Sequence, residues 1–175
     1  MHTTTPAPQP QDVPVTVRWL NPIGCSTFDA PIADLLRGIK QPSTHIEVVS
    51  FDMAHSPTHL EYRAYEALTY ERTLRIARDC GQQNIDALVI GCFYDPALED
   101  AREISGETIV VAPCQASLQV VEHLANRFSI IVGRNKWMEQ MHERVRSYGA
   151  ADRLASMRPL GMGVDEFQKD PALTR

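Results

Sequence analysis

Short apolar runs alternate with longer amphipathic segments along most of the chain, and this alternation constrains the fold more than any other feature. The short runs are rich in β-branched residues, which favours strands. The segments between them repeat apolar residues three and four positions apart, which is typical of helices packed on one face. Strand and helix patterns that alternate in this way predict a parallel sheet covered by helices. We therefore expect an α/β fold.

The expected elements divide the chain into two lobes. Strands are expected at 15–20, 46–51, 87–92, 108–112, 128–132 and, shorter, 154–157. Helices are expected at 28–39, 60–80, 96–104, 115–126 and 135–148. The first and fifth strands both end in a glycine-containing polar loop that opens a helix, which favours two related halves. The sequence predicts a disordered tail at 1–14, a first lobe at 15–112 and an incomplete second lobe at 113–175, each Rossmann-like or flavodoxin-like with a parallel sheet.

Charge and composition exclude several classes of partner. The net charge of −5 argues against nucleic acid, because phosphate binding needs a basic face. No apolar run approaches the ~18 residues that span a bilayer, and residues 1–14 lack the pattern of a signal peptide. The four cysteines stand too far apart for a zinc motif: Cys25, Cys80, Cys92 and Cys114. We expect reduced thiols, no metal, no membrane contact and a cytoplasmic location.

Cys92 is the residue most suggestive of chemistry. It ends the apolar run 87–92 and is followed by two aromatic residues and an Asp95-Pro96 turn. In open α/β sheets, ligands bind at the carboxyl ends of the strands, where a strand would deliver this thiol. The alternative is a buried structural cysteine, since free cysteine is among the most buried residue types. The local sequence leaves both interpretations open.

Four loops are expected to meet at one edge of the sheets, at 21–27, 92–95, 113–117 and 133–136. They carry amide, hydroxyl, thiol and basic side chains: Asn21, Ser26, Thr27, Cys92, Tyr94, Cys114, Gln115, Ser117, Arg134 and Lys136. Such a set suits a small anionic or carbonyl-bearing ligand, whereas dinucleotide and Walker A motifs are absent from the sequence. Packing is favoured for Cys114. Arg134 and Lys136 either bind a carboxylate or form a solvated pair. Glu66 and Glu71 read as edge carboxylates rather than general bases.

The segment Val89-Ile90-Gly91-Cys92-Phe93-Tyr94-Asp95-Pro96-Ala97-Leu98 resembles the first catalytic-cysteine segment of the aspartate/glutamate/hydantoin racemase superfamily, and of hydantoin racemases in particular. Ala101-Arg102-Glu103 follows it as in that family. The loop that begins Asn21-Pro22, the acidic helix that includes Leu60-Glu61, and the run 126–132 are similar to other family segments. The resemblance covers about 15–175.

The resemblance implies a cofactor-independent amino-acid or hydantoin racemase that transfers a proton at a carbon next to a carbonyl. It implies that Cys92 is the thiol acid or base. A site near helix N-termini can favour its thiolate, because the helix dipole stabilises negative charge there. Asn21, Thr27, Tyr94 and Arg134 are the candidate substrate contacts. The expected partners are a hydantoin, an amino acid or a related carboxylate, together with further copies of the chain.

The sequence departs from the family in one respect, because the second catalytic cysteine of the family lies on a later strand that is not found here. We expect either a fragment of a longer protein or a chain that needs a partner, since a shortened second lobe would leave apolar faces uncovered. Two alternatives stay open. One is a one-thiol decarboxylase or isomerase of the same superfamily, and the other is a catalytically inactive module that binds a small acid.

Overall fold

The first lobe is built on a four-stranded parallel sheet in a computed structural model that describes residues 13–164 and 166. Its strands are β1 (Val15–Asn21), β2 (Thr44–Ser50), β3 (Ala87–Ile90) and β4 (Ile109–Val111), in the order β2-β1-β3-β4. Every neighbouring pair is parallel, and the order is that of flavodoxin-like sheets. The α/β fold with parallel sheets is thereby confirmed. Residues 1–12 of the expected tail, together with 165 and 167–175, lie outside the described residues.

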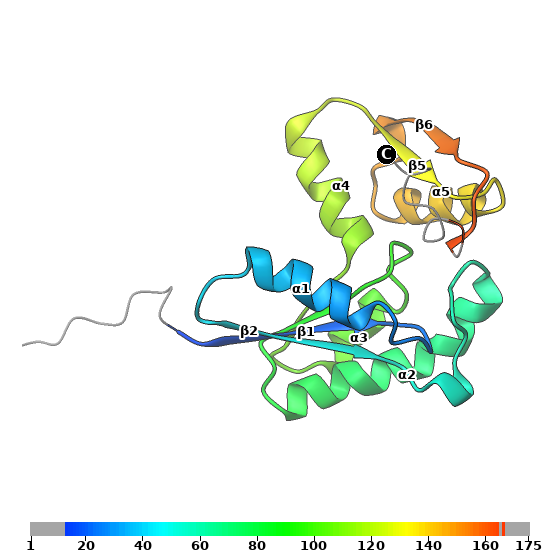
Figure 1. The fold of residues 1–175 in the computed structure, drawn as a ribbon. Helices are drawn as coiled ribbons and strands as arrows, with labels where there is room; N and C mark the ends of the chain where they lie inside the picture. The colour runs from blue at the N-terminus through cyan, green and yellow to red at the C-terminus, as the bar shows by residue number, and fades with distance from the viewer. Residues whose placement is uncertain (1–12, 165, 167–175) are drawn as a thin grey trace, which may run out of the picture.

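Helices α1 (Asp29–Ile39), α2 (Arg63–Gln82) and α3 (Leu98–Ile104) complete the first lobe. The second lobe contains a parallel pair, β5 (Phe128–Val132) and β6 (Leu154–Pro159), with α4 (Pro113–Leu124) and α5 (Trp137–Ser147). Two short 3-10 turns, η2 (Met53–His55) and η3 (Ala151–Arg153), lie in the connections. Figure 1 shows α4 leading from one lobe toward the other. In the described part of the chain, no helix combines the length and apolar character needed to cross a membrane.

The expected long helix at 60–80 begins later, at Arg63. Tyr62 is extended (φ −126°, ψ 139°), so the chain before it is not helical. Glu61 instead accepts a hydrogen bond from the backbone N–H of Val164 in the second lobe (2.8 Å). The residue just before this helix start is thus in contact with one more than a hundred positions away, and no local pattern announces that contact.

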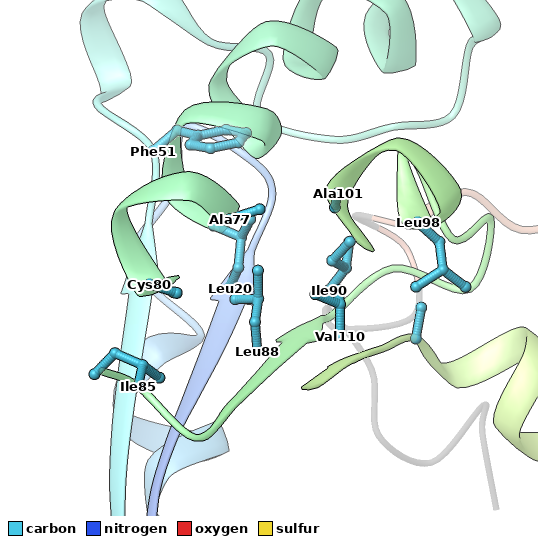
Figure 2. Packing of buried hydrophobic residues seen from close by; sticks show 11 residues of the cluster. Leu20, Phe51, Ala77, Cys80, Ile85, Leu88, Ile90, Leu98, Ala101 and Val110 are labelled. Carbon is cyan, nitrogen blue, oxygen red and sulfur yellow. The ribbon is translucent and has the colours of Figure 1, made fainter. Parts of the chain in front are cut away.

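Each lobe has its own apolar core. In the first, strand residues such as Leu20, Leu88 and Ile90 pack against Ala77 of α2 and Ala101 of α3, as Figure 2 shows. The small side chains on the two helices let them lie close to the sheet. The second core includes Phe128, Ile130, Trp137, Met141 and Val145. Tyr148, which follows α5, packs against both cores, so the lobes share a contact at this residue.

Gly91 lies directly after β3 and directly before Cys92, and its lack of a side chain lets β1 approach it closely. A Cβ at this position would overlap the Trp19 indole and come within 2.9 Å of the Leu20 carbonyl oxygen. We expect Gly91→Ala to lower the free energy of unfolding by about 2 kcal/mol, as overpacking does. Gly38→Ala is the matched control, because Gly38 lies exposed in α1 and a Cβ added there would meet nothing within 4 Å beyond its own helix; this change should stabilise the helix by about 0.5–1 kcal/mol. Urea unfolding of both variants measures the difference, and equal effects would contradict it.

Candidate active site

A cavity of about 440 Å³ lies between the two lobes, at the carboxyl ends of β1 and β3. These neighbouring strands flank the point where the strand order reverses, which is where open α/β sheets bind ligands. We call it the inter-lobe cavity. The first lobe contributes the segments 21–23, 59–61 and 91–94. The second lobe contributes 130–133, Trp137, Met141, Leu160 and Val164. Most of these lining side chains are apolar.

Cys92 lies on the wall of the inter-lobe cavity with its side chain partly buried. The backbone N–H of Gly91 donates to the Leu20 carbonyl (2.7 Å), which ties the start of this loop to β1. Burial raises the pKa of the Cys92 thiol to about 12, and the charges of Glu66 and Asp95 add to the rise. The backbone N–H of Tyr94 and the Arg144 guanidinium lower the same pKa by less. The resting group is therefore a neutral thiol, whereas the sequence favoured a thiolate.

The raised pKa of Cys92 predicts how the rate of its alkylation depends on pH. Only the thiolate reacts, so the rate should rise about tenfold per pH unit from pH 7 to pH 10 without levelling off. A free cysteine peptide, whose pKa is about 8.5, should level off within that range. Peptide mass spectrometry can measure the rate at Cys92 alone. A plateau below pH 9 at Cys92 would contradict the raised pKa.

Two of the four predicted substrate contacts also line the inter-lobe cavity. Tyr94 is 9% exposed, and burial raises the pKa of its hydroxyl, so this group stays protonated and able to donate. Asn21 ends β1 and is 7% exposed. Its side-chain amide donates to the Cys25 carbonyl (3.2 Å) and to the Ser50 hydroxyl (3.1 Å). Both N–H groups of Asn21 thus hold its own loop in place.

The other two predicted contacts lie off the cavity lining. Thr27 is exposed, and its hydroxyl accepts a hydrogen bond from the Cys25 thiol (3.2 Å). Residues 24–27 of this loop are not among the described lining residues, so Thr27 does not follow Asn21 to the cavity. Arg134 pairs with Glu166 at 3.0 Å on the surface of the second lobe. The predicted cationic partner Lys136 lies 3.6 Å from the centre of the Tyr62 ring and 3.8 Å from Glu61.

The lining residues that the sequence-based site did not include comprise His59, Glu61 and Trp137 among others. The side chain of Glu61 is almost fully buried. Among the described lining residues, it is the one that carries a carboxylate. The Trp137 indole N–H is buried without a hydrogen-bond partner in the described part of the chain. Trp137 comes just after the loop 133–136 that was expected at the site, so its place in the sequence could have been used to predict that it lines the cavity. Glu61 belongs to the Leu60-Glu61 segment that resembles the family, but its position on the cavity wall, where it accepts a hydrogen bond from Val164, was not predicted.

Asp95 joins the Cys92 loop to the second lobe. It is fully buried, and its carboxylate accepts hydrogen bonds from the backbone N–H groups of Cys114 (2.9 Å) and Gln115 (2.8 Å) at the start of α4. It also accepts one from the Tyr148 hydroxyl (2.8 Å). Burial raises the pKa of Asp95, and these three donors offset part of the rise. The carboxylate therefore fixes the loop that carries Cys92 against α4.

The remaining candidate residues from the sequence make packing, ion-pair or hydrogen-bond contacts within the protein. Cys114 is fully buried in the second core, which agrees with packing. Glu71 is exposed and pairs with Arg75 one turn along α2. Glu66 is mostly buried between the lobes instead of standing at an exposed edge, and it contacts Gln140 and Arg144 of α5. The described residues contain no group of three or more acidic, histidine or cysteine side chains that could hold a metal ion.

The sequence as a whole matches a known family. A family model described as Asp/Glu/Hydantoin racemase matches residues 20–175. The chain is 28% identical over 155 residues to the hydantoin racemase of Rhizobium meliloti, with 89% of this chain and 63% of that protein covered. It is 30% identical over 152 residues to the hydantoin racemase of Paenarthrobacter aurescens, with 86% and 63% covered.

The fold has a close counterpart among solved structures. The allantoin racemase from Klebsiella pneumoniae superposes with a TM-score of 0.83 at 24% sequence identity, covering 91% of this chain and 64% of that one. The likeness shows that the two chains share a fold. The chain spans a little under two thirds of the length of these relatives.

Proposed function

Because the chain belongs to the Asp/Glu/hydantoin racemase family, we propose that it transfers a proton at a carbon next to a carbonyl, with the Cys92 thiol as the transferring group. The observation that carries this proposal is the position of Cys92. A single thiol stands on the wall of a cavity at the topological switch point, within a segment that resembles the family's catalytic one.

The charge of the inter-lobe cavity favours a neutral ring as the substrate. No lysine or arginine is among the described residues that line it, and Glu61 contributes a carboxylate. An aspartate, glutamate or other dicarboxylate would meet the Glu61 carboxylate with no lysine or arginine among the described lining residues to bind its own carboxylates, and Lys136, off the lining, already lies 3.8 Å from Glu61. A hydantoin ring is uncharged and carries N–H groups, one of them an imide, and carbonyl oxygens. The names of the relatives, hydantoin racemase and allantoin racemase, indicate that those proteins act on rings of this kind.

The residues present can perform one half of the proton exchange. The bond between carbon and hydrogen breaks heterolytically, and its electron pair moves onto the neighbouring carbonyl oxygen to form an enolate. The thiolate form of Cys92, a small fraction at neutral pH because of the raised pKa, is the base that takes this proton, and the resulting thiol can return a proton to the same face of the carbon. Inversion of the centre needs a proton on the opposite face, and water supplies it in this proposal. A thiolate whose conjugate acid has a pKa near 12 is a stronger base than an ordinary cysteine thiolate.

Tyr94 and Asn21 can bind the substrate ring while the proton is transferred. The protonated Tyr94 hydroxyl is a donor for the developing enolate oxygen, and donors placed in a dry cavity give the largest stabilisation of such a charge. Asn21 has both N–H groups engaged, so what it offers a ligand is its amide oxygen, an acceptor for a ring N–H. Both side chains are held rigidly by burial.

Polarimetry of single-enantiomer substrates tests the proposal and its substrate class. A 5-substituted hydantoin and allantoin should lose optical rotation, whereas aspartate and glutamate should keep it. Racemisation of the amino acids alone would overturn the assignment of a neutral ring. Release of CO₂ from an arylmalonate with no effect on the hydantoins would indicate the one-thiol decarboxylase alternative.

A further inference from the structure

Glu61 places a carboxylate on the wall of the inter-lobe cavity, where most of the other lining side chains are apolar. It lies in the extended stretch just before α2, and its side chain is only 9% exposed. One of its oxygens, Oε1, accepts a hydrogen bond from the backbone N–H of Val164 in the second lobe (2.8 Å). The proton transfer proposed for Cys92 gives this carboxylate no task.

The other oxygen of Glu61, Oε2, is open to a further donor. The ammonium of Lys136 lies 3.8 Å from it, which is longer than a hydrogen bond. Lys136 is held over the Tyr62 ring, 3.6 Å from its centre, and stays off the cavity lining. Among the described residues, no donor lies within hydrogen-bond distance of Oε2. An ionised carboxylate accepts on both oxygens, and a desolvated acceptor without a donor costs free energy.

Asn21 adds a second acceptor to the same cavity. Both of its N–H groups are engaged within its own loop, so its amide oxygen is the atom left for a ligand. The Tyr94 hydroxyl is a donor on the same lining. A hydantoin ring has two N–H groups, one on each side of a carbonyl, and therefore supplies one donor for each of the two acceptors. A dicarboxylate without N–H groups would meet Glu61 with acceptors only.

We propose that Glu61 is a specificity-determining residue, whose Oε2 accepts a hydrogen bond from a ring N–H of the substrate. The inference rests on the proposed racemase function and names the group that selects its substrate class, a cyclic imide or ureide with a free N–H. Because Val164 holds Oε1, the acceptor is in place before a ligand binds.

Glu61→Gln tests the proposal in the full chain, because it replaces one oxygen with an NH₂ group of similar size. If the amide oxygen stays with Val164, the NH₂ group opposes the ring N–H; if the amide turns over, the contact with Val164 is lost. The dissociation constant of hydantoin, measured by calorimetry, should rise by about 10- to 100-fold, as for a lost hydrogen bond to a charged acceptor. Unsubstituted hydantoin has no stereocentre, so proton exchange leaves the ligand unchanged.

Methylated hydantoins separate the hydrogen bond from a loosened cavity. 1,3-Dimethylhydantoin has no N–H, so Glu61→Gln should change its affinity by less than about twofold. Of 1-methylhydantoin and 3-methylhydantoin, the one blocked at the N–H that meets Glu61 should be equally insensitive, whereas the other should lose as much affinity as hydantoin. Succinate, which carries acceptors only, should bind Glu61→Gln more tightly than the parent chain.

Glu166→Gln is the matched control. It makes the same change from carboxylate to amide two residues after Val164, at an exposed side chain that pairs with Arg134 and lies off the cavity lining. The affinity for every ligand should stay within about twofold of the parent. If Glu61→Gln folds poorly, the parent chain decides the question alone, and it should bind hydantoin about tenfold or more tighter than 1,3-dimethylhydantoin.

A loss of affinity confined to ligands with the free N–H supports the proposal. An equal loss for hydantoin and 1,3-dimethylhydantoin would mean that Glu61 only maintains the cavity, and unchanged affinity would mean that no ring N–H reaches it. Either result overturns the proposal, as would a parent chain that binds hydantoin no better than its dimethyl form. Binding requires no proton transfer, so these results leave the proposed racemase activity to be judged separately by polarimetry.

Discussion

Replacing Cys92 with serine should lower the rate of α-proton exchange on a hydantoin by about 10²–10⁴-fold, the usual contribution of a positioned acid or base. The substitution keeps the size and the loop but puts a much weaker acid at the transfer position. Because Cys92 is partly buried at the edge of a cavity, its exchange for serine should disturb the fold little. The measurement is the initial rate of deuterium incorporation at the α-carbon in D₂O.

Cys25→Ser is the matched control for this prediction. It makes the same chemical change in a neighbouring loop, but Cys25 lies off the cavity lining and contacts Thr27. Its rate should stay within about twofold of the parent chain, less than 0.5 kcal/mol in barrier height. A Cys92→Ser variant that keeps the parent rate would remove Cys92 from the mechanism.

Replacing Asp95 with alanine should lower the free energy of unfolding by about 3 kcal/mol or more. The change leaves two backbone N–H groups of α4 and the Tyr148 hydroxyl without their buried acceptor, and each lost partner costs about 1–3 kcal/mol. This loss would be a large part of the roughly 5–15 kcal/mol that holds a typical domain folded. Asp95→Asn keeps one acceptor oxygen and should lose less. Urea unfolding measures the difference.

The comparison with Asp52 isolates the effect of burial. Asp52 also accepts a hydrogen bond from a backbone N–H, that of Ala54 (3.0 Å), but its side chain is exposed. Water can replace the carboxylate there, so Asp52→Ala should leave the midpoint of urea unfolding nearly unchanged. If the two alanine variants lose equal stability, the link through Asp95 between the lobes is not a significant source of stability.

Stability should also depend on pH through Asp95. Burial raises its pKa, so the folded chain holds this proton more tightly than the unfolded chain does. The contribution of Asp95 is therefore greatest below its unfolded pKa of about 3.9 and falls as pH rises to the folded value. Above that value it is constant. This sign is opposite to that of an exposed paired carboxylate.

The order of elements was predictable because each has a strong local pattern. The apolar run at Ala87–Ile90 reads as a strand from its own residues, and the parallel strand order then brings its end beside Asn21. The position of Cys92 at a cavity follows from these two facts and from the general rule for open α/β sheets. For the same reason, Tyr94 was found with it.

The parts that the sequence missed depend on partners distant in the chain. Arg134 looks like a free cation until Glu166, on a separate segment, is placed beside it. The raised pKa of the Cys92 thiol comes first from its burial by other parts of the chain, and Glu66 of α2 adds to the rise. Thr27 and Asn21 share one loop, yet the hydrogen bonds of Asn21 to Cys25 and Ser50 decide that only Asn21 faces the cavity. Such contacts leave no periodic signature in the sequence.

The most direct test of the central claim is proton exchange at C5 of a single-enantiomer 5-substituted hydantoin in D₂O at neutral pH, followed by NMR. The account predicts deuterium at C5 faster than in buffer alone, and a return to the buffer rate with Cys92→Ser. Exchange no faster than buffer, or equal exchange in the parent chain and in Cys92→Ser, would contradict it.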